Sequence, residues 1–174
     1  MSDVRDSRAL GRGAVALLAA GALGGLLLAS TRSVVPPGPP PVERLDDRGI
    51  VRQRSRDDCG VAVVAMLVRA AGRDVDLEDL WRSARVPPGG LSLREMAALS
   101  ARLGVRTAPF AMAANDPRTP ATPWVAHLSW NHYVLVESAD DTRVVVADPR
   151  GSRDAYSLRA FTQAWSGYGL AIAE

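Results

Sequence analysis

The chain contains one cysteine, Cys59, and two histidines, His127 and His132, which are its candidates for nucleophilic catalysis. A cysteine attacks a carbonyl carbon as the thiolate, which unpaired N–H groups at a helix N-terminus stabilise. Cys59 lies two residues before the apolar run Val61–Val68, which is typical of a buried helix, and the acidic pair Asp57-Asp58 precedes it as a cap. We therefore expect Cys59 in the first helical turn. A lone cysteine is more often a small buried side chain, so its role depends on its partners.

An imidazole that takes a proton from a thiol needs an acceptor that fixes its tautomer and orientation. His132 begins the β-rich run His132–Ser138, and Asp148 directly follows the run Arg143–Ala147. A three-residue turn at Ala139–Asp141 would place His132 directly opposite Asp148 on one face of a sheet, within hydrogen-bond reach. A two-residue turn would shift the register and break this pairing.

His127 lies in the middle of the strand-like run Trp124–Trp130, and we expect a structural role for it. The tryptophans of this run are expected to pack in the core or to border a cleft. Gln53 lies six residues before Cys59. Its side-chain amide N–H, together with the backbone N–H of Cys59, could form an oxyanion hole, although a lone glutamine is usually a solvated surface residue.

Two groups of elements would position these residues. The first is helical, at Val61–Val68, at Leu77–Ala84 and after the capping-box pattern Ser92–Glu95, with Gly104 as its end. The second consists of short β-rich runs separated by Pro, Asn, Asp and Gly. These are Val105–Phe110, Trp124–Trp130, His132–Ser138, Arg143–Ala147 and Tyr168–Ala173, with one more helix expected at Ser157–Trp165. Helices packed on a later antiparallel sheet predict an α+β fold.

The N-terminal part of the chain does not resemble a globular domain. Residues 13–31 form an uncharged run of 19 residues, preceded by Arg5, Arg8 and Arg12. Such a run is long enough for a single transmembrane anchor, and it also fits a cleaved secretory signal or a soluble apolar helix. The positive-inside rule then places residues 1–12 in the cytoplasm and the catalytic domain outside it, or secreted after cleavage. Residues 32–44 are a proline-rich linker, and 45–174 are the domain.

Composition excludes several classes of function. The 174 residues are enough for one domain of ordinary size. The net charge is only +2, from 21 basic residues, all of them arginine, and 19 acidic ones, so nucleic acid is not the expected partner. A single cysteine excludes an internal disulfide and a multi-cysteine zinc site, and we expect no metal and no cofactor.

Four motifs resemble those of the papain-like cysteine peptidases that process bacteriocin precursors, often as the N-terminal domain of ABC exporters. They are Gln53, Asp58-Cys59-Gly60, His132-Tyr133-Val134 and Asp148-Pro149. The likeness covers about residues 51–172 and includes the segments GGLSLREMAALSARLGV and AFTQAWSGYGLAI. It implies a papain-like fold with N-terminal helices packed on a C-terminal antiparallel sheet.

The resemblance also implies a reaction. Cys59 would be the nucleophile, His132 the general base, Asp148 its orienter and Gln53 the oxyanion donor. The substrate would be the leader of a precursor peptide, cut after Gly-Gly or Gly-Ala, with an ABC exporter as a partner. This chain differs from the exporter form because its sequence contains no nucleotide-binding part. Two alternatives stay open: a module that binds leader peptides without cutting them, and a transglutaminase-like or amidase-like acyl-transfer enzyme.

Overall fold

The structure of the protein is a computed structural model that describes residues 38–113 and 116–173. The expected N-terminal tail at 1–12, the apolar segment at 13–31 and the first part of the linker lie outside these residues. Within the described ranges, none of the helices has the length and apolar character needed to span a bilayer.

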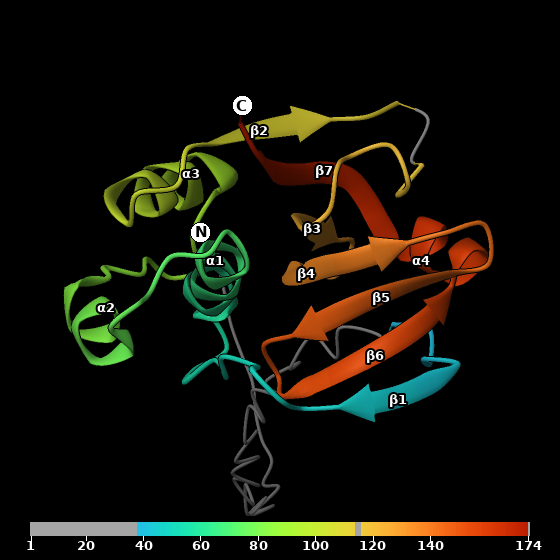
Figure 1. The fold of residues 1–174 in the computed structure, drawn as a ribbon, viewed down its shortest axis with the longest axis horizontal. Coiled ribbons are helices and arrows are strands. Elements are labelled where there is room, and N and C mark those ends of the chain that lie inside the picture. The colour runs from blue at the N-terminus through green and yellow to red at the C-terminus, as the bar shows by residue number, and fades with distance from the viewer. Residues whose placement is uncertain (1–37, 114–115, 174) are drawn as a thin grey trace, which may run out of the picture. The chain divides into compact units, whose positions relative to one another are not determined.

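The fold is α+β, as expected (Figure 1). Seven antiparallel strands form one sheet in the order β1-β6-β5-β4-β3-β7-β2. The helices are α1 (Cys59–Ala70), α2 (Leu77–Ser83), α3 (Leu93–Arg102) and α4 (Leu158–Ala164). The strands are β1 (Glu43–Asp46), β2 (Thr107–Ala111), β3 (Trp124–Leu128), β4 (His132–Ala139), β5 (Arg143–Asp148), β6 (Ser152–Ser157) and β7 (Trp165–Ile172).

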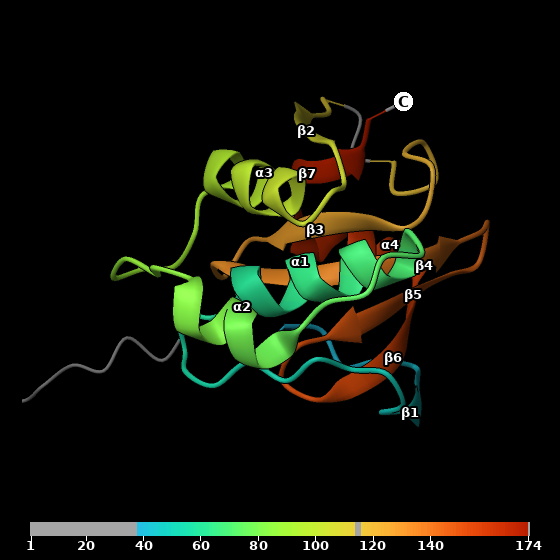
Figure 2. The same cartoon turned by 60° about the vertical axis from the view of Figure 1, so that its left-hand side comes forward.

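Helix α1 is the centre of the larger core. Every residue from Val61 to Val68 is buried, because the helix packs on β3 and β4 on one side and on α3 on the other. This explains why the sequence of α1 is apolar on all sides. Figure 2 shows α1 and α2 in front of the sheet and α4 behind it.

The second core lies on the α4 side of the sheet and is aromatic. Trp124 and Trp165 are buried with ring centroids 4.9 Å apart, and Phe161 of α4 meets Trp124 edge-on. Alternate strand residues supply the two cores: Val125 and Leu135 face α1, whereas Val134 and Val136 belong to the aromatic side. The central strands are therefore covered on both faces.

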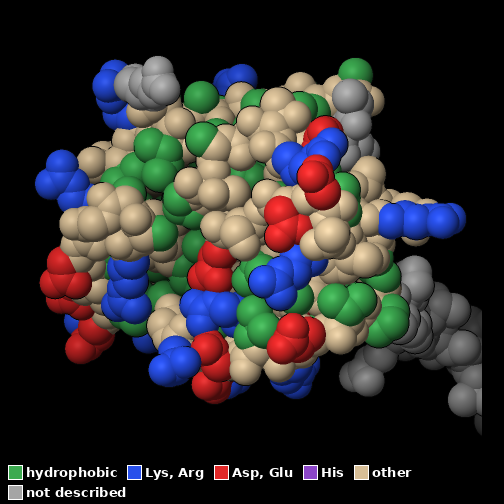
Figure 3. Space-filling model, turned by 45° about the vertical axis from the view of Figure 1, so that its right-hand side comes forward, with side chains coloured by type: hydrophobic (Ala, Val, Ile, Leu, Met, Phe, Trp, Pro, Cys, Tyr) green, Lys and Arg blue, Asp and Glu red, His purple; other side chains and the backbone are tan. Residues whose placement is uncertain are grey.

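Strands β1 and β6 are absent from the sequence-based expectation. Strand β1 is the edge of the sheet, its sequence is ERLD, and it is largely exposed. Strand β6, with the sequence SRDAYS, carries charged residues that make ion pairs with other strands of the sheet, such as Asp154 with Arg44 of the neighbouring β1. Neither strand shows the apolar alternation by which half-buried strands are recognised. Figure 3 shows one face of the molecule, on which arginine and acidic side chains are interspersed.

The expected register between β4 and β5 is wrong. Leu135 pairs with Ala147, and Ala139 pairs with Val144, with a bulge between Val136 and Ser138. The turn falls at residues 140–143 because the Asp140 carboxylate accepts the backbone N–H groups of Thr142 and Arg143. If this register is extended by one residue, Val134 lies opposite Asp148, and His132 is its diagonal neighbour rather than its direct partner.

His132 is fixed by the tight hairpin that joins β3 to β4. Leu128 pairs with His132, and the N–H of Asn131 donates to the Leu128 carbonyl at 3.0 Å. Asn131 has φ +58°, in the left-handed region that suits glycine and asparagine. His132 is therefore the first strand residue after a three-residue loop, which leaves its backbone little freedom.

This geometry predicts that Asn131→Ala lowers the free energy of unfolding by about 1 kcal/mol, because alanine is strained at positive φ. Asn131→Gly should retain the wild-type value. Urea denaturation followed by tryptophan fluorescence measures both. Equal losses in the two variants would contradict the backbone explanation and would assign the loss to the 3.5 Å contact from Asn131 Nδ2 to the Gly89 carbonyl.

Candidate active site

Three of the four candidate residues meet where the N-terminus of α1 reaches the end of the sheet. Cys59 is the first residue of α1, His132 the first of β4, and Asp148 the last of β5. His132 Nε2 lies 2.8 Å from Asp148 Oδ1, and the two side chains are only 8% and 4% exposed. His132 also makes a hydrogen bond with the Cys59 side chain. The imidazole therefore bridges the thiol and the carboxylate.

The charge state of Asp148 decides which imidazole nitrogen carries the proton. Burial favours the neutral acid, but hydrogen bonds from His132 and Arg150 outweigh it, and the pKa of Asp148 lies well below its ordinary value. An ionised carboxylate only accepts hydrogen bonds, so the nitrogen next to it, Nε2, is the N–H donor. This leaves Nδ1 as the nitrogen that carries no proton when the imidazole is neutral.

The protonated form of His132 is favoured as well. Burial favours the neutral imidazole and lowers its pKa, but the hydrogen bonds with Asp148 and Cys59 outweigh burial, so the pKa of His132 lies above its ordinary value. Such an imidazole holds a proton that it can give to a leaving group. An imidazolium beside a cysteine stabilises the thiolate, which is the nucleophilic form.

The start of α1 places Cys59 at the surface of the larger core. Asp58 occupies the N-cap position, as expected of an acidic residue there, but its side chain makes no capping hydrogen bond. The first hydrogen bonds of the helix run from the N–H groups of Val61 and Ala62 to the Asp58 carbonyl, so the preceding N–H groups of Cys59 and Gly60 can stabilise negative charge near Cys59. Gly60 allows a close approach to α3 and its preceding loop, because a Cβ there would lie 3.2 Å from Leu91 Cβ.

A narrow cleft of about 60 Å³ opens beside Cys59. One wall is the loop that contains Gly89 and Gly90, and the other is the β3–β4 hairpin with Trp130 and Asn131. Gly90 has φ +89°, and a Cβ there would lie 3.0 Å from the Asp57 carbonyl oxygen, so a side chain at this position would be strained. The cleft is lined in full by Arg56, Asp57, Cys59, Gly89, Gly90, Trp130, Asn131 and Tyr133.

Trp130 also contacts the described part of the linker. Gly38 lies against its indole ring so closely that no Cβ would fit there. Trp130 thus borders the cleft, as expected for one of the tryptophans, whereas Trp124 and Trp165 are buried in the aromatic core.

Gln53 is held close to the Asp148 turn by its backbone. Its N–H donates to the Pro149 carbonyl at 2.8 Å. Its side-chain Nε2 donates to the Ser55 carbonyl at 2.7 Å, which occupies one of the two amide hydrogens, and Oε1 is buried without a hydrogen-bond partner in the described part of the chain. The structure therefore places Gln53 beside the site, with one N–H already used within its own loop.

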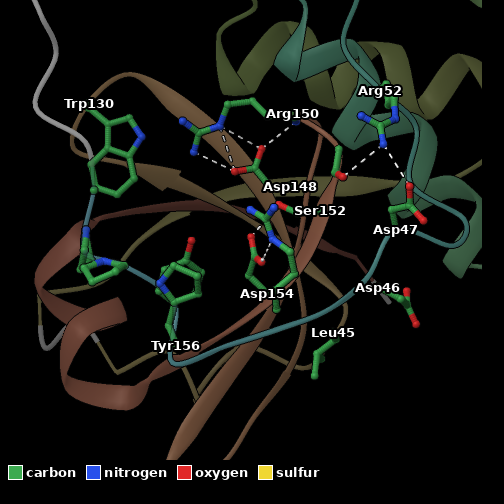
Figure 4. Close-up of a pocket in the computed structure, with 16 residues that line it drawn as sticks. Leu45, Asp46, Asp47, Arg52, Trp130, Asp148, Arg150, Ser152, Asp154 and Tyr156 are labelled. Carbon is green, nitrogen blue, oxygen red and sulfur yellow. Dashed lines mark hydrogen bonds and ion pairs between the residues drawn. The ribbon is translucent and has the colours of Figure 1, made fainter.

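Arg150 belongs to the site, although sequence reasoning missed it. The Asp148 carboxylate accepts the backbone N–H of Arg150 at 2.8 Å and its guanidinium Nε and Nη2 at 3.0 and 2.8 Å (Figure 4). The signal was present in the sequence Asp-Pro-Arg-Gly, whose residues suit a tight turn with aspartate first, proline second and glycine last. The N–H of Gly151 closes that turn on the Asp148 carbonyl at 2.9 Å.

His127 makes different contacts. Its Nδ1 lies 2.9 Å from the Ser166 hydroxyl, which donates to the carbonyl of His127 itself. Its ring packs near that of Tyr133, with centroids 5.0 Å apart. Partial burial lowers the pKa of His127 below its ordinary value. These contacts support the expected structural role, which stays a prediction.

The described residues contain no cluster of three or more His, Cys, Asp or Glu side chains that could hold a metal ion. The chemistry available from the side chains is that of a thiol, an imidazole and a carboxylate in series. Such a series suits nucleophilic attack on an acyl carbon followed by proton transfer to a leaving group.

The chain is similar in sequence to a known protein family and to individual members of other proteomes. A profile of the peptidase C39 family matches residues 47–174. The chain is 24% identical over 123 residues to the colicin V secretion/processing ATP-binding protein CvaB of Escherichia coli, covering 71% of this chain and 18% of CvaB. It is 27% identical over 128 residues to an uncharacterised protein of Methanothermobacter marburgensis, covering 74% of this chain and 90% of that one.

Solved structures share the fold. A double-glycine-motif protease from an AMS/PCAT transporter, solved in complex with the leader peptide, matches with a TM-score of 0.65 and 19% identity, over 76% of this chain and 96% of that one. The peptidase domain of Streptococcus ComA matches with a TM-score of 0.60 and 21% identity, over 71% and 96% of the two chains. On the profile match, which covers most of the described domain, the chain belongs to the peptidase C39 family.

Proposed function

We propose that this chain is a cysteine endopeptidase that cleaves the leader peptides of secreted precursor peptides after Gly-Gly. The observation that carries the proposal is the buried His132, which joins the Cys59 thiol to the Asp148 carboxylate beside a narrow cleft. The names of similar proteins support the substrate class, since one is a secretion/processing protein and another was solved with a leader peptide bound.

The acylation step follows from the order of the three groups. The Cys59 thiolate attacks the carbonyl carbon of the scissile peptide bond, and its electron pair forms the S–C bond while the carbonyl oxygen becomes an oxyanion. The backbone N–H of Cys59 and the second amide hydrogen of Gln53 would stabilise this oxyanion. As the C–N bond breaks, Nδ1–H of His132 gives its proton to the departing amine. A thioester and a neutral imidazole remain.

Deacylation uses the same imidazole as a base. His132 Nδ1 takes a proton from a water molecule, and the resulting hydroxide attacks the thioester carbon. The C–S bond breaks, the leader leaves as a carboxylic acid, and the thiolate–imidazolium pair is restored. Throughout the cycle the Nε2–H group of His132 donates its hydrogen bond to Asp148 Oδ1. This hydrogen bond keeps Nδ1 directed toward the reacting atoms.

The cleft restricts what can be cut. A volume of about 60 Å³ between the Gly89–Gly90 loop and the β3–β4 hairpin accepts a peptide backbone with small side chains. Packed walls resist expansion, because an extra methylene group forces neighbouring atoms apart at a cost of about 1–3 kcal/mol. Two glycines before the scissile bond fit this constraint. Contacts of the rest of the leader would then position the bond and contribute to kcat.

The site of action is also part of the proposal. We propose that residues 13–31 anchor the chain in the membrane, or are removed as a signal, and that the catalytic domain works outside the cytoplasm. An ABC exporter that delivers the precursor is the proposed partner.

The proposal predicts a steep dependence of cleavage on the residue before the cut. In leader peptides that carry Gly, Ala, Ser, Val or Leu there, the full chain under reducing conditions should cleave Gly fastest and leave Val and Leu intact. Mass spectrometry of the products measures the rates. Cys59→Ala should abolish cleavage, and iodoacetamide should label the wild type at Cys59 alone and inactivate it.

The outcomes separate the alternatives. Comparable cleavage of the Val and Leu peptides would refute the double-glycine specificity. Binding of the Gly-Gly peptide without cleavage would indicate a binding module, and transfer of the acyl group to an added amine in place of water would indicate an acyl-transfer enzyme.

A second prediction is that His132→Ala and Asp148→Ala lose activity non-additively, because the two side chains act as a unit. The double variant should be about as slow as the slower single variant in kcat/KM. His127→Ala is the matched control and should stay within a few-fold of wild type. Fully additive losses, or a His127 loss as large as that of His132, would overturn the assignment.

Gln53→Ala should lower kcat about 10²- to 10³-fold with little change in KM, the cost of removing one oxyanion donor. Gln163→Ala, at an exposed position of α4, is the matched control and should leave both constants unchanged. Steady-state kinetics on the Gly-Gly peptide measures the difference. An unchanged kcat in Gln53→Ala would return Gln53 to a purely structural role in its loop.

A further inference from the structure

We infer that Arg150 is a positioning residue of this site. Its guanidinium donates hydrogen bonds to Oδ2 of Asp148, and these keep Oδ1 oriented to accept the hydrogen bond from Nε2 of His132. The inference extends the proposed function, since it concerns the same three reacting groups. Arg150 does not line the cleft beside Cys59, so its effect on the reaction would pass through Asp148 and His132.

His132 and Arg150 share the Asp148 carboxylate. His132 contacts only Oδ1, at 2.8 Å, so His132 alone would let the carboxylate rotate and exchange its two oxygens. Arg150 contributes two donors to Oδ2, at 3.0 and 2.8 Å, and its backbone N–H to Oδ1 at 2.8 Å. With both oxygens engaged by charged or fixed donors, the carboxylate has one orientation.

Arg150 is itself held in place by the turn that contains it. It is the third residue of the turn that Gly151 closes on Asp148. Gly151 has φ +111° and leaves no room for a Cβ, because the Arg52 guanidinium lies against it. Arg52 in turn donates to the Gly151 carbonyl at 3.4 Å and to Asp47 at 3.0 Å. The turn is thus supported from the segment that leads to Gln53.

Asp148 and Arg150 differ in their exposure to solvent. The Asp148 side chain is 4% exposed, whereas that of Arg150 is 54% exposed. Figure 4 shows Arg150 folded back over the carboxylate, in a second pocket, distinct from the cleft beside Cys59, that Asp148, Arg150 and Trp130 all line. An exposed ion pair contributes little to stability, but a charged donor to a buried carboxylate can determine its geometry. Arg150 therefore matters for orientation more than for folding.

Arg150 also places a positive charge near His132. Its charge lowers the pKa of His132 and so opposes the effect of Asp148. Removal of Arg150 should raise the pKa of His132, because the carboxylate would then serve the imidazolium alone. The charged or titratable groups that act on this pair are Cys59 of α1, His127 of β3, Arg150 of the turn and Tyr156 of β6.

The test is a histidine titration by NMR, which needs no substrate. The full chain has two histidines, so ¹³C-labelled histidine gives two resonances, which His127→Ala assigns. In Arg150→Met the His132 midpoint should move to higher pH. In Arg150→Lys, which keeps the charge but not the paired donors, the midpoint should stay near the wild-type value. The matched control is Arg143→Met, at an equally exposed arginine of β5 that pairs with Asp140.

Kinetics on the Gly-Gly peptide gives the second readout. Arg150→Met should lower kcat about 10- to 100-fold, the range expected when a reacting group is misplaced, with KM unchanged. Arg150→Lys should recover part of kcat. A His132 midpoint that is the same in Arg150→Met, Arg143→Met and wild type, each folded by circular dichroism, would overturn the inference. If the midpoint shifts in Arg150→Met while the wild type cleaves no leader peptide, the proposed function fails, and the shift supports the electrostatic coupling of Arg150 to His132 alone.

Discussion

The ionised carboxylate of Asp148 is the constraint on which the rest of the site depends. A buried charge is unfavourable unless donors replace the water it has lost. Here the donors are His132 from β4 and both the backbone and the guanidinium of Arg150. The satisfied charge fixes the tautomer of His132, and that tautomer determines which nitrogen faces Cys59. The proposed reaction of the thiol thus depends on the hydrogen bonds of a carboxylate that belongs to strand β5.

The second constraint is the burial of α1. Its first residue is the proposed nucleophile, and its following residues are buried between the sheet and α3. A helix packed on all sides cannot shift along its axis without breaking contacts in both layers. Gly60 permits the close approach to Leu91 that completes this packing at the reactive end. Cys59 is therefore positioned by the hydrophobic core and His132 by a tight hairpin, and the sheet connects the two.

The sequence was sufficient for the features that have local causes. The capping box at Ser92–Glu95, the apolar helix after Cys59 and the alternating strands all have patterns that reflect burial or capping directly. The contact between His132 and Asp148 was predicted from a wrong register, because the Asp140 carboxylate moves the turn and a bulge adds a residue. The contact exists because the diagonal neighbour is also within reach. Arg150 was missed because its contacts depend on the path of the turn after Asp148, and the polar strands β1 and β6 were missed because they lack the apolar alternation of a half-buried strand.

The hairpin that carries His132 also supplies one wall of the cleft. Trp130 and Asn131 border the cleft and directly precede His132, so a change that widens this wall would also move the imidazole. The opposite wall, at Gly89 and Gly90, carries none of the reacting groups of the proposed mechanism. Its left-handed backbone and the contact of Gly90 with the Asp57 carbonyl keep it close to Cys59. Under the proposed function, a substitution in the 87–90 loop would widen the cleft for a larger residue before the cut and leave His132 in place, whereas a substitution in the hairpin wall would also move the imidazole.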